Sequence, residues 1–306
     1  MEHLSFYWLA RNPSRVLEGL ETEFTQRVQK TIATQTIKLP PIPDTVLTLQ
    51  RICMDESTTV SDIANVLLDD PSLAAAVIRS ANTVYFNRRN ITCTNLVTAV
   101  SRLGIVRVKD IVTAHAIEQL KHENPLDNTC QKVLKQSAFS ARELGASMVL
   151  VIQELQIIDH EEYRHLEADK ALLLGCLADI GLYCLVSEYH HHNEQGHYLD
   201  LEIALHIFQS QCASISLEVL SRWGFDSDFL AVSSNSRIAG ESDRVEYLDV
   251  ARIAHHLLMF RHQDARIDEH EVEINVHGAE VLYTLSNLTK HTYKKRENEI
   301  IKTCGW

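Results

Sequence analysis

Residues 58–82 read TTVSDIANVLLDDPSLAAAVIRSAN, and this stretch carries the signals of two helices joined by a tight junction. Thr59 followed by Asp62 has the spacing of a capping box, in which each side chain bonds the backbone of the other at a helix start. Asp70 followed by Pro71 places a capping side chain beside a residue that favours the first helical position. We therefore expect one helix to begin after Thr59 and a second to begin at Pro71.

Apolar side chains repeat at helical spacing in this stretch and beyond it. The three sets are Leu73, Val77, Ile78 and Ala81; Leu96, Val100 and Leu103; and Val133, Leu134, Ala138, Ala141, Leu144, Met148, Ile152 and Leu155. Gly104 follows the second set, where a glycine suits a helix C-terminal cap. All 6 prolines lie in the first 125 residues, and no Asn-Gly or Asp-Gly hairpin signal occurs. The pattern predicts an all-α fold, almost wholly helical in its C-terminal part.

Polar and proline-bearing segments divide this pattern into four expected parts. The segment LPPIP should end an N-terminal helix, KHENPLDN should separate two helical lobes, and DARIDEHEVEINV should precede a final helix. The expected parts are an N-terminal helical extension at 1–35, an N-terminal lobe at 36–125, a second lobe at 126–262 and a C-terminal helical extension at 263–306.

Composition and charge narrow the class of protein. Hydrophobic residues make up 45% and charged residues 23%, as in soluble globular proteins. The apolar run at 171–186 contains Asp179, which favours a core helix over a membrane span, and residues 1–16 do not resemble a secretory signal. A formal net charge of −12 makes nucleic acid an unexpected partner. The 7 cysteines form no C-x-x-C pair, so we expect reduced thiols in a cytoplasmic protein.

Several motifs of the chain resemble, in order and spacing, the HDOD domain family. They are LPPIPDTVLTLQRI at 39–52, DDPSLAAAVIRSANTVYF at 69–86, ITCTNLVTAVSRLGIVRVKDIV at 91–112, QSAFSARELGASM at 136–148, ALLLGCLADIGLYCLV at 171–186 and SLEVLSRWGF at 216–225. The resemblance extends over roughly residues 36–262. It implies a two-lobed HDOD fold whose second lobe, 126–262, is like the metal-dependent HD hydrolases, usually without their complete metal site.

A catalytic HD site needs several histidine and aspartate ligands to hold divalent metals that activate water. By the resemblance, the first histidine position holds Gln136, the His-Asp pair is Ala178 with Asp179, and the final aspartate position holds His255. Positions where the family often has further histidines hold Cys212 and, nearby in the second case, Asn235 and Ser236. We therefore expect a vestigial site without metal or cofactor, in which Asp179 accepts hydrogen bonds. The alternative is a metal held by Asp179 and His255.

Other candidate residues have an ordinary structural interpretation beside the functional one. His190, His191, His192 and His197 could catch a metal, but we interpret them as a polar loop, and Cys176 and Cys212 as packed thiols. The arginines Arg79, Arg88, Arg89 and Arg102, with Arg107 and Lys109, make the first lobe locally basic. They form a candidate surface for a phosphorylated ligand or an acidic partner, or simply a solvated face.

The resemblance implies a function in bacterial signal transduction. We expect a non-catalytic regulatory module that acts through protein partners, with a small nucleotide as a candidate ligand and no membrane contact. The rival hypothesis is a metal-dependent phosphohydrolase with a rearranged metal site. No motif identifies the partner or the oligomeric state.

Overall fold

The computed structural model describes residues 23–34, 43–53, 55, 57–83, 86–87, 91–123, 126–237, 244–269, 272 and 274–303. Helices make up 77% of the described residues, which contain no strand. The prediction of an all-α fold is confirmed.

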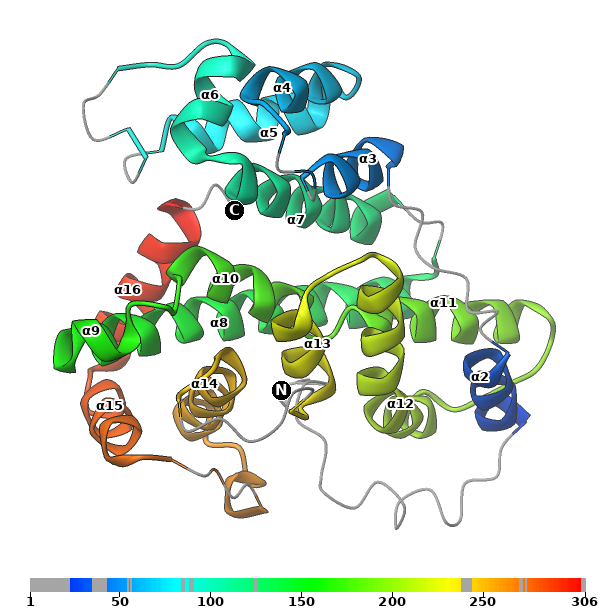
Figure 1. The fold of residues 1–306 in the computed structure, drawn as a ribbon. Helices are drawn as coiled ribbons and strands as arrows, with labels where there is room; N and C mark the ends of the chain where they lie inside the picture. The colour runs from blue at the N-terminus through cyan, green and yellow to red at the C-terminus, as the bar shows by residue number, and fades with distance from the viewer. Residues whose placement is uncertain are drawn as a thin grey trace. The chain divides into compact units, whose positions relative to one another are not determined.

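Two compact units, each discontinuous in sequence, make up the chain (Figure 1). The first unit contains α2 (Glu23–Ala33), α8 (Asn128–Ile158), α9 (His160–Tyr163), α10 (Ala168–Leu177), α11 (Gly181–Glu194), α12 (Leu201–Arg222), α13 (Ser227–Ser234), α14 (Tyr247–His262), η1 (Ile267–Glu269) and α15 (Val276–Ser286). The second unit contains α3 (Asp44–Ile52), α4 (Val60–Leu68), α5 (Pro71–Ala81), α6 (Leu96–Leu103), α7 (Ile105–Glu123) and all but the first residue of α16 (Lys290–Thr303). The division into four parts that the sequence suggests remains a prediction.

The helix boundaries of the second unit follow the capping signals. The Thr59 side chain accepts a hydrogen bond from the Asp62 backbone, and the Asp62 carboxylate accepts one from the Thr59 backbone, so the capping box is confirmed. The Asp70 carboxylate caps α5 by accepting from two backbone N–H groups, with Pro71 at the first helical position. Gly104 ends α6 with a φ of +84°, which a residue with a side chain rarely adopts.

The core of the second unit is built from the predicted apolar faces. Leu73 and Val77 of α5 are fully buried, as is Val100 of α6. Helix α5 packs against α4, α6 and α7, and α3 packs against α4 and α7. Each of these short helices is therefore held mainly by burial of one stripe rather than by its own propensity.

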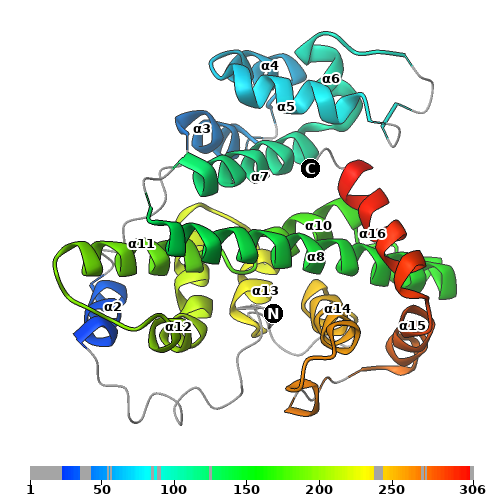
Figure 2. The ribbon, with the colours of Figure 1, turned by 180° about the vertical axis from the view of Figure 1, so that it is seen from behind.

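Helix α8 is the central helix of the first unit, and five other described helices of the unit pack against it. At 31 residues it is the longest helix and spans about 46 Å. Figures 1 and 2 show α10 lying alongside it, and α9, α11, α14 and α15 also contact it. Helix α11 in turn contacts α2 and α12, so α8 connects the two ends of the unit.

Two glycines set the close approach of α8 and α10. A Cβ atom placed on Gly175 would lie 2.3 Å from both the Cα and the N atom of Gly145, and one placed on Gly145 would lie 2.5 Å from the Leu172 carbonyl oxygen. Because these neighbours are backbone atoms, they cannot rotate away as a flexible side chain could. The two helices can cross at this distance only with glycine at both positions.

The apolar segment 171–186 differs from its prediction as one helix. It forms parts of α10 and α11 around a turn at 178–180, where backbone bonds run three residues back instead of four. Ala178 donates to the Gly175 carbonyl, and Leu182 donates to the Asp179 carbonyl. This tightening is typical of a 3₁₀ interruption within a helical segment.

Within the part of the chain that the structure describes, two helical segments have the length and apolar composition needed to cross a membrane, Lys170–Glu194 and Leu201–Arg222. In the first, 89% of the apolar window is buried inside the protein, as in a core helix, and in the second 44% is buried. The composition of both is explained at least in part by their packing in the first unit.

Replacing a core residue of α5 tests the second unit. Leu73→Ala should lower the free energy of unfolding by about 2 to 5 kcal/mol, because it removes buried methyl groups and leaves a cavity. Arg79→Ala, on the exposed side of the same helix, should change it by less than about 0.5 kcal/mol. Denaturant melts compare the two, and similar small losses would mean that the buried face of α5 is wrongly assigned.

Replacing a glycine at the crossing of α8 and α10 tests the first unit. Helix propensity alone would make Gly175→Ala stabilising by about 1 kcal/mol. The contact with Gly145 should reverse the sign and give a loss of about 1 to 3 kcal/mol, the usual cost of overpacking. Thermal or denaturant unfolding shows whether Gly175→Ala raises or lowers the free energy of unfolding. A stabilised variant would contradict the close crossing of α8 and α10.

Candidate functional site

Asp179 lies in the turn between α10 and α11 and is 5% exposed. The Ser137 hydroxyl, on α8, donates a hydrogen bond to the Asp179 Oδ2 atom. A buried carboxylate needs such donors to offset its lost hydration. Asp179 therefore connects the turn to α8 through an interaction between residues 42 positions apart in sequence.

The backbone on the other side of Asp179 is packed directly against α12. The Gly181 N–H donates to the Ser216 hydroxyl at 2.9 Å, and a Cβ on Gly181 would lie 2.5 Å from the Ser216 backbone nitrogen. The Cys212 thiol lies 3.8 Å from the Asp179 carbonyl oxygen and 3.8 Å from the Ser216 hydroxyl. Burial raises the pKa of Cys212 well above its ordinary value, so this residue is a packed thiol.

The other positions of the expected HD site supply few ligand atoms. Ala178 is buried and has no polar side chain, Gln136 is half-buried on α8, and His255 is 3% exposed on α14. A divalent metal in an HD site normally requires several carboxylate and imidazole ligands. Among the described residues, the group of three or more candidate ligands that comes together includes neither Asp179 nor His255. This donor set does not fit the HD metals.

Asn235 and Ser236 have a structural role at the end of α13. Asn235 adopts the left-handed conformation with φ +50°, and Arg252 of α14 donates to both its side-chain oxygen (3.0 Å) and its backbone carbonyl (3.1 Å). The Ser236 hydroxyl lies 2.9 Å from that of Ser234. The Arg252 bonds join the end of α13 to α14, and the serine contact lies within the end of α13.

The candidate basic surface of the second unit is only partly described. Arg79 is exposed on α5, whereas Arg88 and Arg89 lie outside the described residues. The Arg102 guanidinium donates to the Ala81 and Ile91 carbonyls, each at 2.9 Å, so its main contacts are within the unit. Arg79 is thus the described member of the set most available to a ligand or partner.

The histidine run differs from the predicted polar loop, since residues 190–192 lie within α11, which ends at Glu194. His192 is 4% exposed, contacts the Phe24 ring and stacks on His197 with ring centroids 4.9 Å apart. Burial lowers the pKa of His192, and the neighbouring His197 adds to this effect. The prediction was wrong for residues 190–192 because the helix continues through them, and its spacing sends one of them to a buried face. His197 lies in the loop after α11, as expected.

The sequence analysis did not single out Ser137 or Ser216. The Ser137 hydroxyl donates to Asp179, and the Ser216 hydroxyl accepts from the Gly181 N–H just after the turn. A signal for Ser137 was present, since it lies next to Gln136 in the motif QSAFSARELGASM. Ser216 is the first residue of the motif SLEVLSRWGF and lies one helical turn after Cys212, but its role depends on the crossing of α11 and α12, which this spacing does not indicate.

Removing the contact between Ser137 and Asp179 tests its structural role. Asp179→Asn should cost about 1 to 3 kcal/mol of unfolding free energy, the usual scale for a disturbed buried charged hydrogen bond. Ser137→Ala should cost a similar amount, and the double variant should cost less than the two losses added together, because both remove one interaction. Ser214→Ala, exposed on α12, is the control. Additive losses in denaturant melts would contradict a shared bond.

Comparisons with known proteins agree with this fold. The structure is similar to a protein named "Putative metal-dependent phosphohydrolase" from Shewanella amazonensis SB2B (TM-score 0.69, 19% identity, covering 96% of this chain and 99% of that one). It is also similar to an HDOD domain protein with unknown function from Geobacter sulfurreducens (TM-score 0.52, 18% identity, 91% and 96%) and to a "Putative signal transduction protein" from Marinobacter aquaeolei VT8 (TM-score 0.51, 17% identity, 98% and 65%). No curated protein matches the chain significantly. The HDOD domain matches residues 39–237, most of the chain, and the chain therefore belongs to the HDOD domain family.

Proposed function

We propose that this HDOD protein is a non-catalytic regulatory module of bacterial signal transduction, acting in the cytoplasm through protein contacts. A small nucleotide is the candidate ligand. The observation that carries this proposal is the state of the HD position: Asp179 accepts a hydrogen bond from Ser137, and Ala178 beside it offers no ligand. A residue used to hold two helices together is poorly suited to bind an exchangeable metal and phosphate.

The surface offers some support for protein contacts. Large apolar side chains are exposed on the second unit, including Leu68 at 66%, Val106 at 63% and Ile91 at 60%. On the first unit Tyr198 is 90% exposed and Tyr283 is 75% exposed. Single exposed apolar residues are common on any protein, so they favour partner binding only in combination with the altered HD position.

A phosphohydrolase is the rival function, favoured by the name of the Shewanella amazonensis neighbour. At 19% identity that neighbour establishes the fold only. For this chain to act in the same way, Asp179 and His255 would need further ligands, and Asp179 would have to exchange its Ser137 contact for a metal.

A hydrolysis assay separates the two functions. The purified chain, stripped with a chelator and reloaded with Mn²⁺, Fe²⁺ or Mg²⁺, is given p-nitrophenyl phosphate and cyclic dinucleotides. We expect no turnover above that of Asp179→Asn. Turnover that is lost in Asp179→Asn at unchanged stability would establish the phosphohydrolase and overturn the proposal.

A binding comparison addresses the regulatory function directly. Proteins cross-linked to the chain in its native cell are identified for the wild type, for Arg79→Glu in the second unit and for Arg164→Glu in the first, both exposed arginines. We expect a specific partner that Asp179→Asn retains and that one of the two charge reversals loses. A partner set indistinguishable from that of an unrelated acidic protein would contradict a role through protein contacts.

A further inference from the structure

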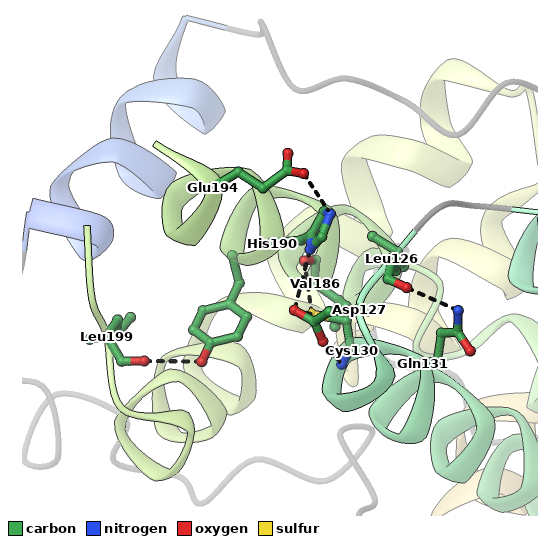
Figure 3. A network of polar contacts seen from close by, with 9 residues as sticks. Leu126, Asp127, Cys130, Gln131, Val186, His190, Glu194 and Leu199 are labelled. Atoms are coloured by element: carbon green, nitrogen blue, oxygen red, sulfur yellow. Dashed lines mark hydrogen bonds and ion pairs between the residues drawn. The ribbon is translucent and has the colours of Figure 1, made fainter. Parts of the chain in front are cut away.

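Three side chains with different metal-binding atoms meet where α8 begins and α11 ends. Asp127 caps α8, Cys130 lies in its first turn, and His190 lies near the C-terminal end of α11 (Figure 3). Their candidate ligand atoms all lie within 4.8 Å of one another. The residues come from two segments separated by 60 positions or so in sequence, and the contact of α8 with α11 brings them together.

The two oxygens of Asp127 have different partners. Oδ1 accepts the Cys130 backbone N–H at 2.8 Å, which is the ordinary capping bond. Oδ2 lies 3.3 Å from His190 Nδ1 and 3.6 Å from Cys130 Sγ. Capping thus fixes the carboxylate and directs its second oxygen toward a thiol and an imidazole.

The two separations that involve Asp127 Oδ2 match those of ligands around one tetrahedral zinc ion. With Zn–O and Zn–N bonds of about 2.0 Å and a Zn–S bond of about 2.3 Å, tetrahedral angles place O and N about 3.3 Å apart and O and S about 3.5 Å apart. The observed distances are 3.3 Å and 3.6 Å. One carboxylate and one thiolate would also neutralise the charge of a divalent cation.

His190 has the second partner that metal-bound histidines usually have. Its Nε2 atom lies 3.4 Å from the Glu194 carboxylate one helical turn later, while Nδ1 faces Asp127. A carboxylate on the far ring nitrogen fixes the tautomer and makes the other nitrogen a better ligand. Figure 3 shows the imidazole between the two carboxylates.

We infer that Asp127, Cys130 and His190 form a zinc site that joins the start of α8 to the end of α11, with Glu194 as the partner of His190. The fourth position is open to water, because the Asp127 side chain is 43% exposed. The site is separate from the HD position at Asp179 and does not depend on the proposed function.

Without metal, Cys130 is a protonated thiol. Burial raises the pKa of Cys130 to about 12, and the Asp127 carboxylate adds to the shift. Zinc binding must therefore displace the Cys130 proton into solvent as the Zn–S bond forms. The alternative to a bound metal is a simple ion-pair network of His190 with Asp127 and Glu194.

Titration of the chelator-stripped full chain with Co²⁺, and then Zn²⁺, distinguishes the zinc site from the ion-pair network. We expect one equivalent of Co²⁺ to give a thiolate charge-transfer band in the near ultraviolet and tetrahedral bands in the visible, all lost when Zn²⁺ displaces it. Cys130→Ser should abolish the thiolate band. Glu194→Gln should keep the band but weaken affinity by roughly 10- to 100-fold. If Cys130→Ser fails to fold, Asp127→Asn, which keeps a capping oxygen, should show the loss of affinity.

Matched variants keep the inference falsifiable. Cys184→Ser removes a buried thiol of α11 outside the site, and His191→Gln removes the exposed histidine next to His190. Neither variant should change the thiolate band or the Co²⁺ affinity. The absence of a thiolate band at stoichiometric Co²⁺ would leave the ion-pair network in place and overturn the zinc site. A thiolate band that survives Cys130→Ser would also overturn the zinc site. If His191→Gln weakened Co²⁺ affinity as much as His190→Gln, the histidine run would be binding the metal adventitiously, and the zinc site would again be overturned.

Discussion

The close crossing of α8 and α10 is the constraint on which the rest of the first unit depends. Gly145 and Gly175 remove the side chains that would keep two helix backbones apart. Ser137 lies two turns before Gly145 on α8, and Asp179 follows Gly175 by one turn's length. The glycine contact and the Ser137 bond to Asp179 therefore lie along one antiparallel interface. The position at which α10 packs on α8 therefore determines the position of the turn at 178–180.

The turn fixes what can happen at the HD position. After Asp179, the chain is held against α12 by Gly181 and Ser216, so this backbone has contacts on two sides. An aspartate in such a place can be retained for its hydrogen bond alone, because the loss of a donor to a buried carboxylate is costly. The hydrogen bond and the packing thus give Asp179 a structural role in the turn.

Sequence patterns predicted features that depend on near neighbours. The capping box of Thr59 and the cap at Asp70 could be read from residues two or three positions apart, and they are present as expected. The turn at 178–180 was missed because tertiary contacts, not local residues, interrupt the helix there. The apolar run 171–186 therefore carries no sequence signal for the interruption. Ser216 was missed for the same reason, since its partner Gly181 is 35 residues away. The HD-site positions came from the family resemblance, and the structure shows the surroundings that a resemblance cannot supply.

Asp179 and Asp127 illustrate how tertiary contacts separate the roles of two aspartates. Asp179 is 5% exposed and accepts from a neutral serine hydroxyl in a packed interface. Asp127 is 43% exposed at its side chain, has one oxygen occupied by its cap, and turns the other toward Cys130 and His190. A cation at Asp127 would replace the Asp127–His190 contact with bonds to both side chains, whereas at Asp179 it would have to displace Ser137. Metal binding in this chain is thus better supported at the end of α11 than at the position where the family resemblance directs attention.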